Sequence, residues 1–79
     1  MNKSEIKDAI LELDGQNVAV CFNATREGTK GLQVWGVCHA VKFPFHAWLY
    51  SFKGNMFPLI PQNIEFIVKL KCEPNEIQY

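Results

Sequence analysis

The sequence predicts an α+β domain in which an N-terminal helix packs on a curled antiparallel sheet of four to five strands. Two observations lead to this fold class. Apolar residues recur at helical spacing near the start of the chain, and after Gly15 they alternate every second residue. The alternating segments follow one another through short links, which is typical of antiparallel neighbours in a small sheet.

The first predicted element is a helix from about residue 4 to residue 14. Ser4 is the expected N-cap, since its hydroxyl can accept a hydrogen bond from an otherwise unpaired amide of the first turn. Gly15 can adopt the left-handed conformation that ends a helix. The residues at helical spacing form one apolar face: Ile6, Ala9, Ile10 and Leu13.

Five strands are expected after the helix, separated by polar, glycine-containing or proline-containing links. Pro44 cannot donate a hydrogen bond to a ladder, so it indicates a corner between the second and third strands. In the last strand, Ile64, Phe66, Val68 and Leu70 alternate with charged residues and should face the core. The expected strands are 17–23, 32–42, 46–53, 56–60 and 63–72, with a loose tail at 74–79.

The order of one helix followed by five short strands resembles the small barrels of the SH3-like and Sm-like type. This resemblance implies a sheet that curls strongly enough to close and hide its unpaired edges. The Asp and Asn of the first Sm motif and the Arg-Gly of the second have no counterparts here. The resemblance therefore concerns the fold alone.

The length of 79 residues predicts a single domain covering residues 1–79. The formal net charge of zero argues against nonspecific attachment to a polyanion. The charged N-terminus contains no apolar run long enough for a signal peptide or a membrane span, so we expect a cytoplasmic protein. In a reducing compartment, the three cysteines are expected to be free thiols.

Alternation in the second and third strands separates a large aromatic face from a small one. Our main interpretation buries the aromatic face, because each buried aromatic ring contributes roughly 1.5–3 kcal/mol. The alternative packs the helix on the small face and leaves the aromatic face to a partner or a second copy. The aromatic face contains Trp35, Val37, His39, Val41, His46, Trp48, Tyr50 and Phe52; the small face contains Leu32, Val34, Gly36, Cys38, Ala40, Ala47, Leu49 and Ser51.

No catalytic, cofactor or metal signature is present in the sequence. The residues that could ligate zinc lack the spacing of known zinc motifs, and adjacent Cys38 and His39 would point to opposite faces of a strand. Neither a phosphate-binding loop nor a pair of carboxylates suited to acid–base work is recognisable. We therefore expect no enzyme and no cofactor. The potential zinc ligands are Cys21, Cys38, His39, His46 and Cys72.

The main prediction is therefore a protein-binding role. The protein would act as an inhibitor, an adaptor or a small bacterial or phage-encoded regulator. Self-association through strand edges or apolar loops is also expected, giving a homo-oligomer such as a homodimer. Apolar residues in a connector must fold back, plugging the open end of a barrel, or contact a partner. The predicted partner-binding residues lie at the Pro44 corner and in the proline-flanked connector: Phe43, Phe45, His46, Met56, Phe57, Leu59 and Ile60.

The alternative function is binding of single-stranded nucleic acid. Bases stack on aromatic rings in such sites, and lysines neutralise the phosphates. Arg26 and Lys30 could add charge from the first loop. The residues predicted for this role are Lys42, Phe43, Phe45, Trp48 and Lys53.

Overall fold

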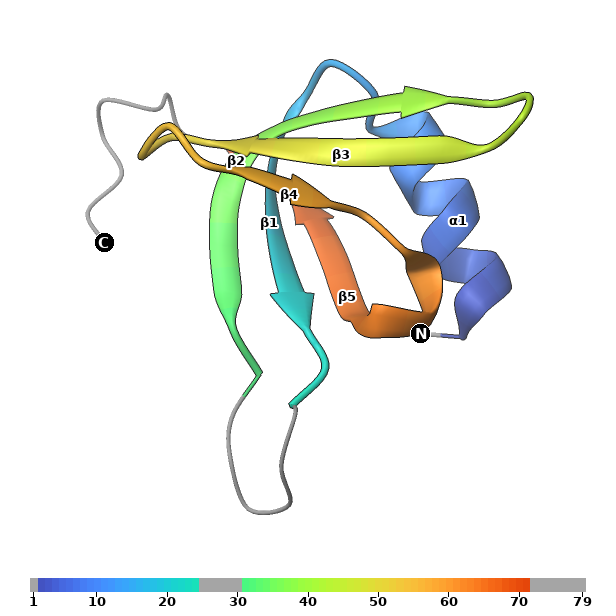
Figure 1. The fold of residues 1–79 in the computed structure, drawn as a ribbon, viewed down its shortest axis with the longest axis horizontal. Helices are drawn as coiled ribbons and strands as arrows, with labels where there is room; N and C mark the ends of the chain where they lie inside the picture. The colour runs from blue at the N-terminus through green and yellow to red at the C-terminus, as the bar shows by residue number, and fades with distance from the viewer. Residues whose placement is uncertain (1, 25–30, 72–79) are drawn as a thin grey trace.

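One helix and a five-stranded antiparallel sheet make up the computed structural model, which describes residues 2–24 and 31–71 (Figure 1). The predicted α+β fold class is confirmed. The predictions for Arg26, Lys30, Cys72 and the tail at 74–79 lie outside the described residues. The elements are α1 (Lys3–Glu12), β1 (Asn17–Phe22), β2 (Gln33–Val41), β3 (His46–Ser51), β4 (Met56–Pro58), the 3-10 turn η1 (Pro61–Asn63) and β5 (Ile64–Lys69).

The sheet is curled because β2 pairs with different neighbours along its length. Its first half lies beside β1 and its second half beside β3, and β2 bends between them (Figure 1). Gly36 lies where the two pairings overlap, and a Cβ there would meet the backbone oxygen of Tyr50 and lie 2.7 Å from the Cα of Ser51. Only glycine permits this close approach of two backbones.

The strand order is β4-β3-β2-β1-β5, and the sheet does not close into a barrel. The closure implied by the resemblance to SH3-like and Sm-like barrels is therefore wrong for the described chain. The short β4 and the longer β5 form the two edges. Residues at the start of β2 and in the β3–β4 hairpin line one pocket.

The N-cap of the helix lies two residues before the predicted one. Asn2 is the N-cap: its side-chain oxygen accepts a hydrogen bond from the Glu5 amide at 2.9 Å, and the Glu5 carboxylate accepts one from the Asn2 amide at 3.3 Å. This reciprocal pair is a capping box. Ser4, the predicted cap, lies inside the helix instead. Gly15 adopts a φ of 82°, as predicted from its place after the helix.

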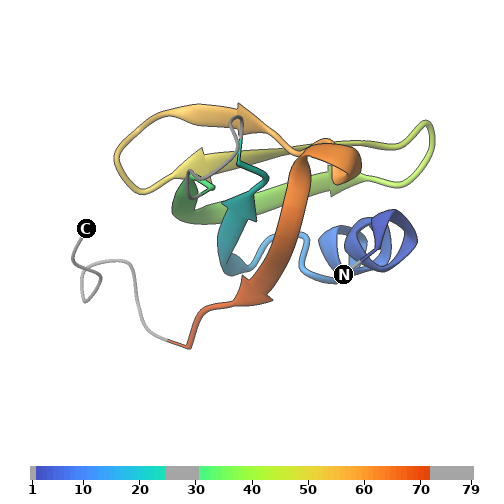
Figure 2. The ribbon, with the colours of Figure 1, turned by 90° about the horizontal axis from the view of Figure 1, so that it is seen from below.

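The hydrophobic core lies between α1 and the face of the sheet that carries the small residues, which we call the inner face. Helix α1 packs against β2, β5 and η1 at one end of the curled sheet (Figure 2). The main interpretation, which buried the aromatic face, is wrong, and the alternative placement of the helix on the small face is confirmed. The core residues are Ile6, Ile10, Val18, Val20, Val34, Cys38, Ala47, Leu49, Leu59, Ile64 and Ile67.

A hydrogen bond anchors the helix to the inner face. Cys38 is completely buried, and its Sγ donates to the backbone oxygen of Ile10 at 3.6 Å. The small side chains along β2 leave room for this approach. Aromatic residues on the inner face would not allow this contact, since their rings would hold the helix away from the strands.

Strand β5 departs from the predicted alternation because of a β-bulge. Ile64 pairs with Phe22 and Phe66 pairs with Cys21, so Glu65 is an extra residue. After the bulge the inward position moves by one residue. Ile67 is therefore buried, whereas Val68 is 48% exposed. The prediction that Val68 faces the core is wrong for this reason, and Phe66 is only half-buried.

Candidate functional site

The face of the sheet opposite α1 carries most of the large side chains of the two central strands. We call it the outer face. The pairing places His39 opposite Trp48, and it places Tyr50 between Val37 on one side and Met56 on the other. These side chains alternate with the inner-face residues along the same strands. The outer face consists of Trp35, Val37, His39, Val41, His46, Trp48, Tyr50, Met56 and Val68.

A cluster of four rings forms the centre of the outer face. The imidazoles of His46 and His39 lie nearly parallel to the Trp48 indole, at centroid distances of 5.4 and 5.7 Å and interplanar angles of 12° and 14°. The Tyr50 ring meets His39 edge-on at 5.1 Å. Offset stacking and edge-to-face contact are the favourable geometries for such rings. The cluster therefore holds its side chains in place without the helix.

The Trp48 indole has a buried polar atom. Its Nε1 has no hydrogen-bond partner among the described residues. Burial of an unpaired donor costs free energy unless another group accepts its hydrogen.

Apolar groups surround the ring cluster and reach solvent. Tyr50 is 47% exposed and Met56 is 62% exposed, and Val41 lies at the exposed end of β2. Phe43, at the tip of the β2–β3 turn, is 93% exposed. Monomeric proteins rarely expose contiguous apolar surface of this kind unless it contacts something.

On the other side of the ring cluster, the outer face continues across β1 to β5. Ala19 pairs with Trp35 on one side and with Val68 on the other. Ala19 is only 3% exposed, because these larger neighbours cover it. The apolar surface thus extends over strands β3, β2, β1 and β5.

The structure divides the predicted partner-binding residues between several places. Phe43 and Met56 are exposed as described above, whereas Leu59 is 2% exposed and belongs to the core. Phe57 is half-buried, and its ring lies 6.0 Å from that of Phe22. Part of the connector therefore folds back onto the core, which is the alternative considered for it.

Four of the predicted residues come together around a groove of about 270 Å³. It lies between the start of β3 and the segment that leads from β4 into η1. The Nζ of Lys7 on the helix lies 5.1 Å from the centre of the Phe45 ring. The residues around the groove are Phe45, His46, Ala47, Pro58, Leu59, Ile60 and Pro61.

The residues predicted for nucleic-acid binding do not form one surface. Lys42 precedes β3 and Lys53 follows it, so the two lysines lie at opposite ends of this strand. Phe45 packs against the core, whereas Trp48 belongs to the outer face. A strand of six residues spans about 20 Å.

The described thiols lie in environments that favour the protonated form. Burial, together with the Asp14 carboxylate, raises the pKa of Cys38 from 9.0 to about 11. Partial burial and the nearby Glu65 carboxylate raise the pKa of Cys21, whose Sγ lies 3.8 Å from Glu65 Oε2. A nucleophilic cysteine requires the opposite shift.

Within residues 2–24 and 31–71, the structure contains no cluster of three His, Cys, Asp or Glu side chains able to hold a metal ion. Among the helical residues of the same ranges, none belongs to a helix long and apolar enough to cross a membrane.

The predicted partner-binding residues did not include His39, Tyr50 or Val68, although the alternative interpretation left the face that carries His39 and Tyr50 to a partner. Alternation places the first two beside Trp48, and the small residues on the opposite face were the available signal that a helix could pack there. Val68 reached the outer face through the bulge, for which the sequence carried no signal.

We compared the chain with known protein families, curated proteins and solved structures. The chain matches no protein-family model, no curated protein and no solved structure at a significant level.

Proposed function

We propose that the protein is a non-enzymatic protein-binding module that acts by occupying a surface of its partner through the outer face. The observation that carries this proposal is the position of the ring cluster opposite the helix. The core is filled by the inner face and α1. The rings of Trp48 and Tyr50 are therefore available for contact with another molecule.

The residue types of the outer face support this function. Trp, Tyr and Met are enriched in protein interfaces, and Trp and Tyr dominate their energetic hot spots. Their position on paired strands keeps the rings fixed before binding, which reduces the entropy lost on association. The exposed side chains of Tyr50 and Met56 lie on neighbouring strands and provide one continuous contact area.

The kind of partner surface follows from the composition of the outer face. On β2 and β3 it combines apolar rings with imidazole nitrogens, and at its β1–β5 end the Glu65 carboxylate lies 3.8 Å from the Sγ of Cys21. An apolar patch with polar groups at its rim would complement it. Such blocking of a partner's surface is how an inhibitor, an adaptor or a small regulator acts.

A capture experiment with a matched charge control tests the proposal. The double variant Tyr50→Glu, Met56→Glu places two carboxylates on the outer face. The control Ser4→Glu, Gln62→Glu adds the same charge at exposed positions away from it. We expect wild type and control to retain the same protein from a lysate of the source organism, and the outer-face variant to lose it. Equal retention by all three proteins would contradict the role of the outer face.

Sedimentation of the same proteins shows whether the partner is a second copy of the chain. In that case the wild type and the control should sediment as dimers and the outer-face variant as a folded monomer. A dimer that persists in the outer-face variant would place self-association elsewhere, at a strand edge or in the groove beside Phe45.

Titration with single-stranded DNA and RNA tests the alternative function. We expect no measurable affinity at low salt, because the net charge is zero and Lys42 and Lys53 lie far apart along β3. A clear affinity that falls steeply with added salt would support nucleic-acid binding over the protein-binding proposal.

A further inference from the structure

Phe43, at the tip of the β2–β3 turn, is the most exposed large apolar side chain among the described residues. It is 93% exposed, so the core of its own chain does not use it. The turn covers residues 42–45 and projects from the end of the sheet that α1 and η1 also occupy (Figure 2). Because a ring in water lacks the free energy of apolar burial, contact of Phe43 with another apolar surface would be favourable.

The groove beside Phe45 lies at the same end of the molecule and is large enough for such a ring. Its volume is about 270 Å³, whereas a cavity of about 150 Å³ is enough to hold benzene. Two of its residues, Ala47 and Leu59, belong to the core, and Ile60 is 41% exposed, so the groove connects solvent with the core. Among the described residues that line it, only His46 can carry a charge. An apolar group is therefore the occupant that suits it.

A projecting ring and an apolar groove at the same end of one chain form a self-complementary surface. The exposure of Phe43 shows that it does not fill the groove of its own chain. In a two-fold dimer both chains use the same patch, so a contact between the ring of one chain and the groove of the other is made twice. We propose that two copies of this chain associate in this way, with Phe43 of each copy in the groove of the other.

The area of this contact predicts a weak dimer. A buried aromatic side chain removes about 150–250 Å² of its own surface from solvent, and the groove around it loses a similar area. Two such contacts bury roughly 600–1,000 Å² in total, which is at the lower end of the range for specific interfaces. We therefore expect a dimer that forms and dissociates with concentration, with a Kd of roughly 10–500 μM.

This contact shares only His46 with the outer face, so the inference does not depend on the proposed function. The outer-face variant Tyr50→Glu, Met56→Glu keeps both Phe43 and the groove, and it should still form the dimer. A dimer that is lost in this variant and retained in Phe43→Ala would overturn the inference, because self-association would then use the outer face.

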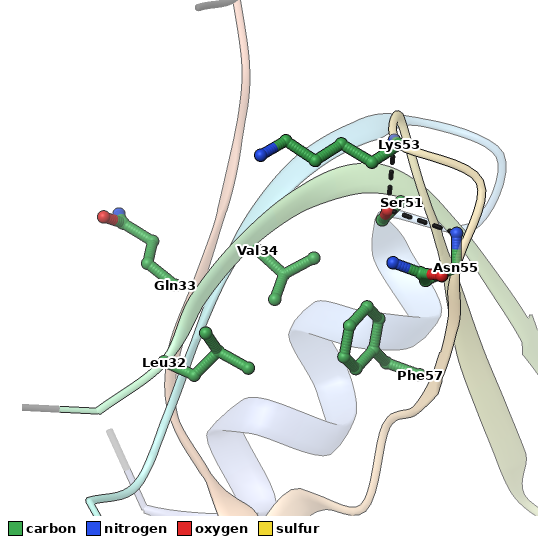
Figure 3. A pocket seen from close by; sticks show the side chains of 7 residues that line it. All are labelled: Leu32, Gln33, Val34, Ser51, Lys53, Asn55 and Phe57. Carbon is green, nitrogen blue, oxygen red and sulfur yellow. Dashed lines mark hydrogen bonds between the residues drawn. The ribbon is translucent and has the colours of Figure 1, made fainter. Parts of the chain in front are cut away.

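Sedimentation of the full-length chain as a function of concentration tests the proposal. Phe43→Ala should raise the Kd of the dimer by about 100-fold or more, because each dimer loses two buried rings. Leu32→Ala is the matched control: Leu32 is 58% exposed but lines the pocket between the start of β2 and the β3–β4 hairpin (Figure 3), so the Kd should not change. A wild type that stays monomeric well above the expected Kd, or equal Kd values for the two variants, would overturn the proposal.

Two variants that fail alone and associate when mixed identify the contact itself. Phe43→Glu places a carboxylate on the ring's side of the contact, and Ile60→Lys places an ammonium group in the groove; each variant alone should be a monomer. An equimolar mixture should form a heterodimer, because it contains one unchanged ring–groove contact and one pair of opposite charges. A mixture that remains monomeric, or a dimer of either variant alone, contradicts the proposal. Thermal unfolding of each variant confirms that folded chains are compared.

The amide resonances of the 15N-labelled full-length chain show where the two copies meet. Between dilute and concentrated samples, we expect the amides of Phe43, Ala47 and Ile60 to shift. The amides of Val34 and Asn55, which line the pocket in Figure 3, should keep their positions. Shifts that leave out Phe43 and the groove would overturn the proposal, whichever other residues they affect.

Discussion

The inner and outer faces of β2 and β3 are built from alternate residues of the same strands, yet they are stabilised in different ways. On the inner face, small residues such as Cys38 and Ala47 belong to the core that the helix completes. On the outer face, large rings such as Trp48 and Tyr50 contact one another. The size of a side chain therefore did not decide whether it was buried.

Access for the helix decided which face became the core. Two apolar helix residues, Ile6 and Ile10, fill the space above the small side chains and are themselves 1% and 0% exposed. The rings on the other side bury much of their own surface by stacking. One face therefore contributes to stability through the helix, while the other is available for binding.

The largest expected difference is between the neighbours Leu49 and Tyr50. Leu49 is fully buried on the inner face, so Leu49→Ala should lower the free energy of unfolding by about 2–5 kcal/mol. Tyr50 is 47% exposed, and Tyr50→Ala should cost about 1 kcal/mol or less. Urea denaturation of both variants measures the difference. Similar losses in the two would mean that both faces are part of the core.

The next effect is a loss of stability at high pH caused by Cys38. Its pKa is raised by burial to about 11, so the unfolded chain releases this proton at lower pH than the folded one. The thiol's contribution is therefore complete below pH 9 and is lost as the pH rises toward 11, by about 2–3 kcal/mol. Urea denaturation as a function of pH measures the loss.

Cys38→Val is the matched control for the pH experiment, since it fills a similar volume without a titrating group. In this variant the free energy of unfolding should not show the loss that Cys38 causes between pH 9 and 11. A wild-type curve parallel to that of the variant would show that Cys38 is not buried on the inner face as described.

A smaller effect is expected at the bend of the sheet. Gly36→Ala introduces a Cβ that would lie 2.7 Å from the Cα of Ser51, and backbone atoms cannot move aside cheaply. We expect a loss of about 1–3 kcal/mol, as for other overpacked sites. Thermal unfolding measures it. An unchanged Tm would mean that β2 and β3 are not held this close together.

The smallest expected effect is the coupling between His39 and Trp48 on the outer face. A double-mutant cycle with His39→Ala and Trp48→Leu should give a coupling free energy of about 0.5–1.5 kcal/mol. The same cycle with His39→Ala and Val68→Ala should give nearly none, because no contact between those two side chains stabilises the cluster. Additive effects in both cycles would indicate that the rings do not stack.

Much of the fold followed from the sequence alone. Local spacing predicted the helix and the five strands, and it divided residues 33–41 and 46–51 correctly into two faces. The left-handed conformation of Gly15 and the turn around Pro44 were predicted as well. These features depend on the backbone geometry of a few neighbouring residues, which the local pattern records.

The candidate site was only partly predictable. The sequence identified the corner at Phe43 and the exposed Met56, but it also included Leu59, which is buried in the core. Spacing along a strand cannot show which connector residues fold back. Spacing also could not predict that Leu32 and Phe57 line the same pocket, because their proximity depends on how far the sheet curls.

Which residues share a face follows from the local pattern, since side chains on a strand alternate regardless of what surrounds them. Three features could not be predicted from this pattern: which face points inward, the bulge at Glu65 that reverses the alternation, and the open edges of the sheet. These features depend on contacts between segments that lie far apart in the sequence. The helix packs where its side chains fit most closely, and in this protein that surface is the one with the smaller residues.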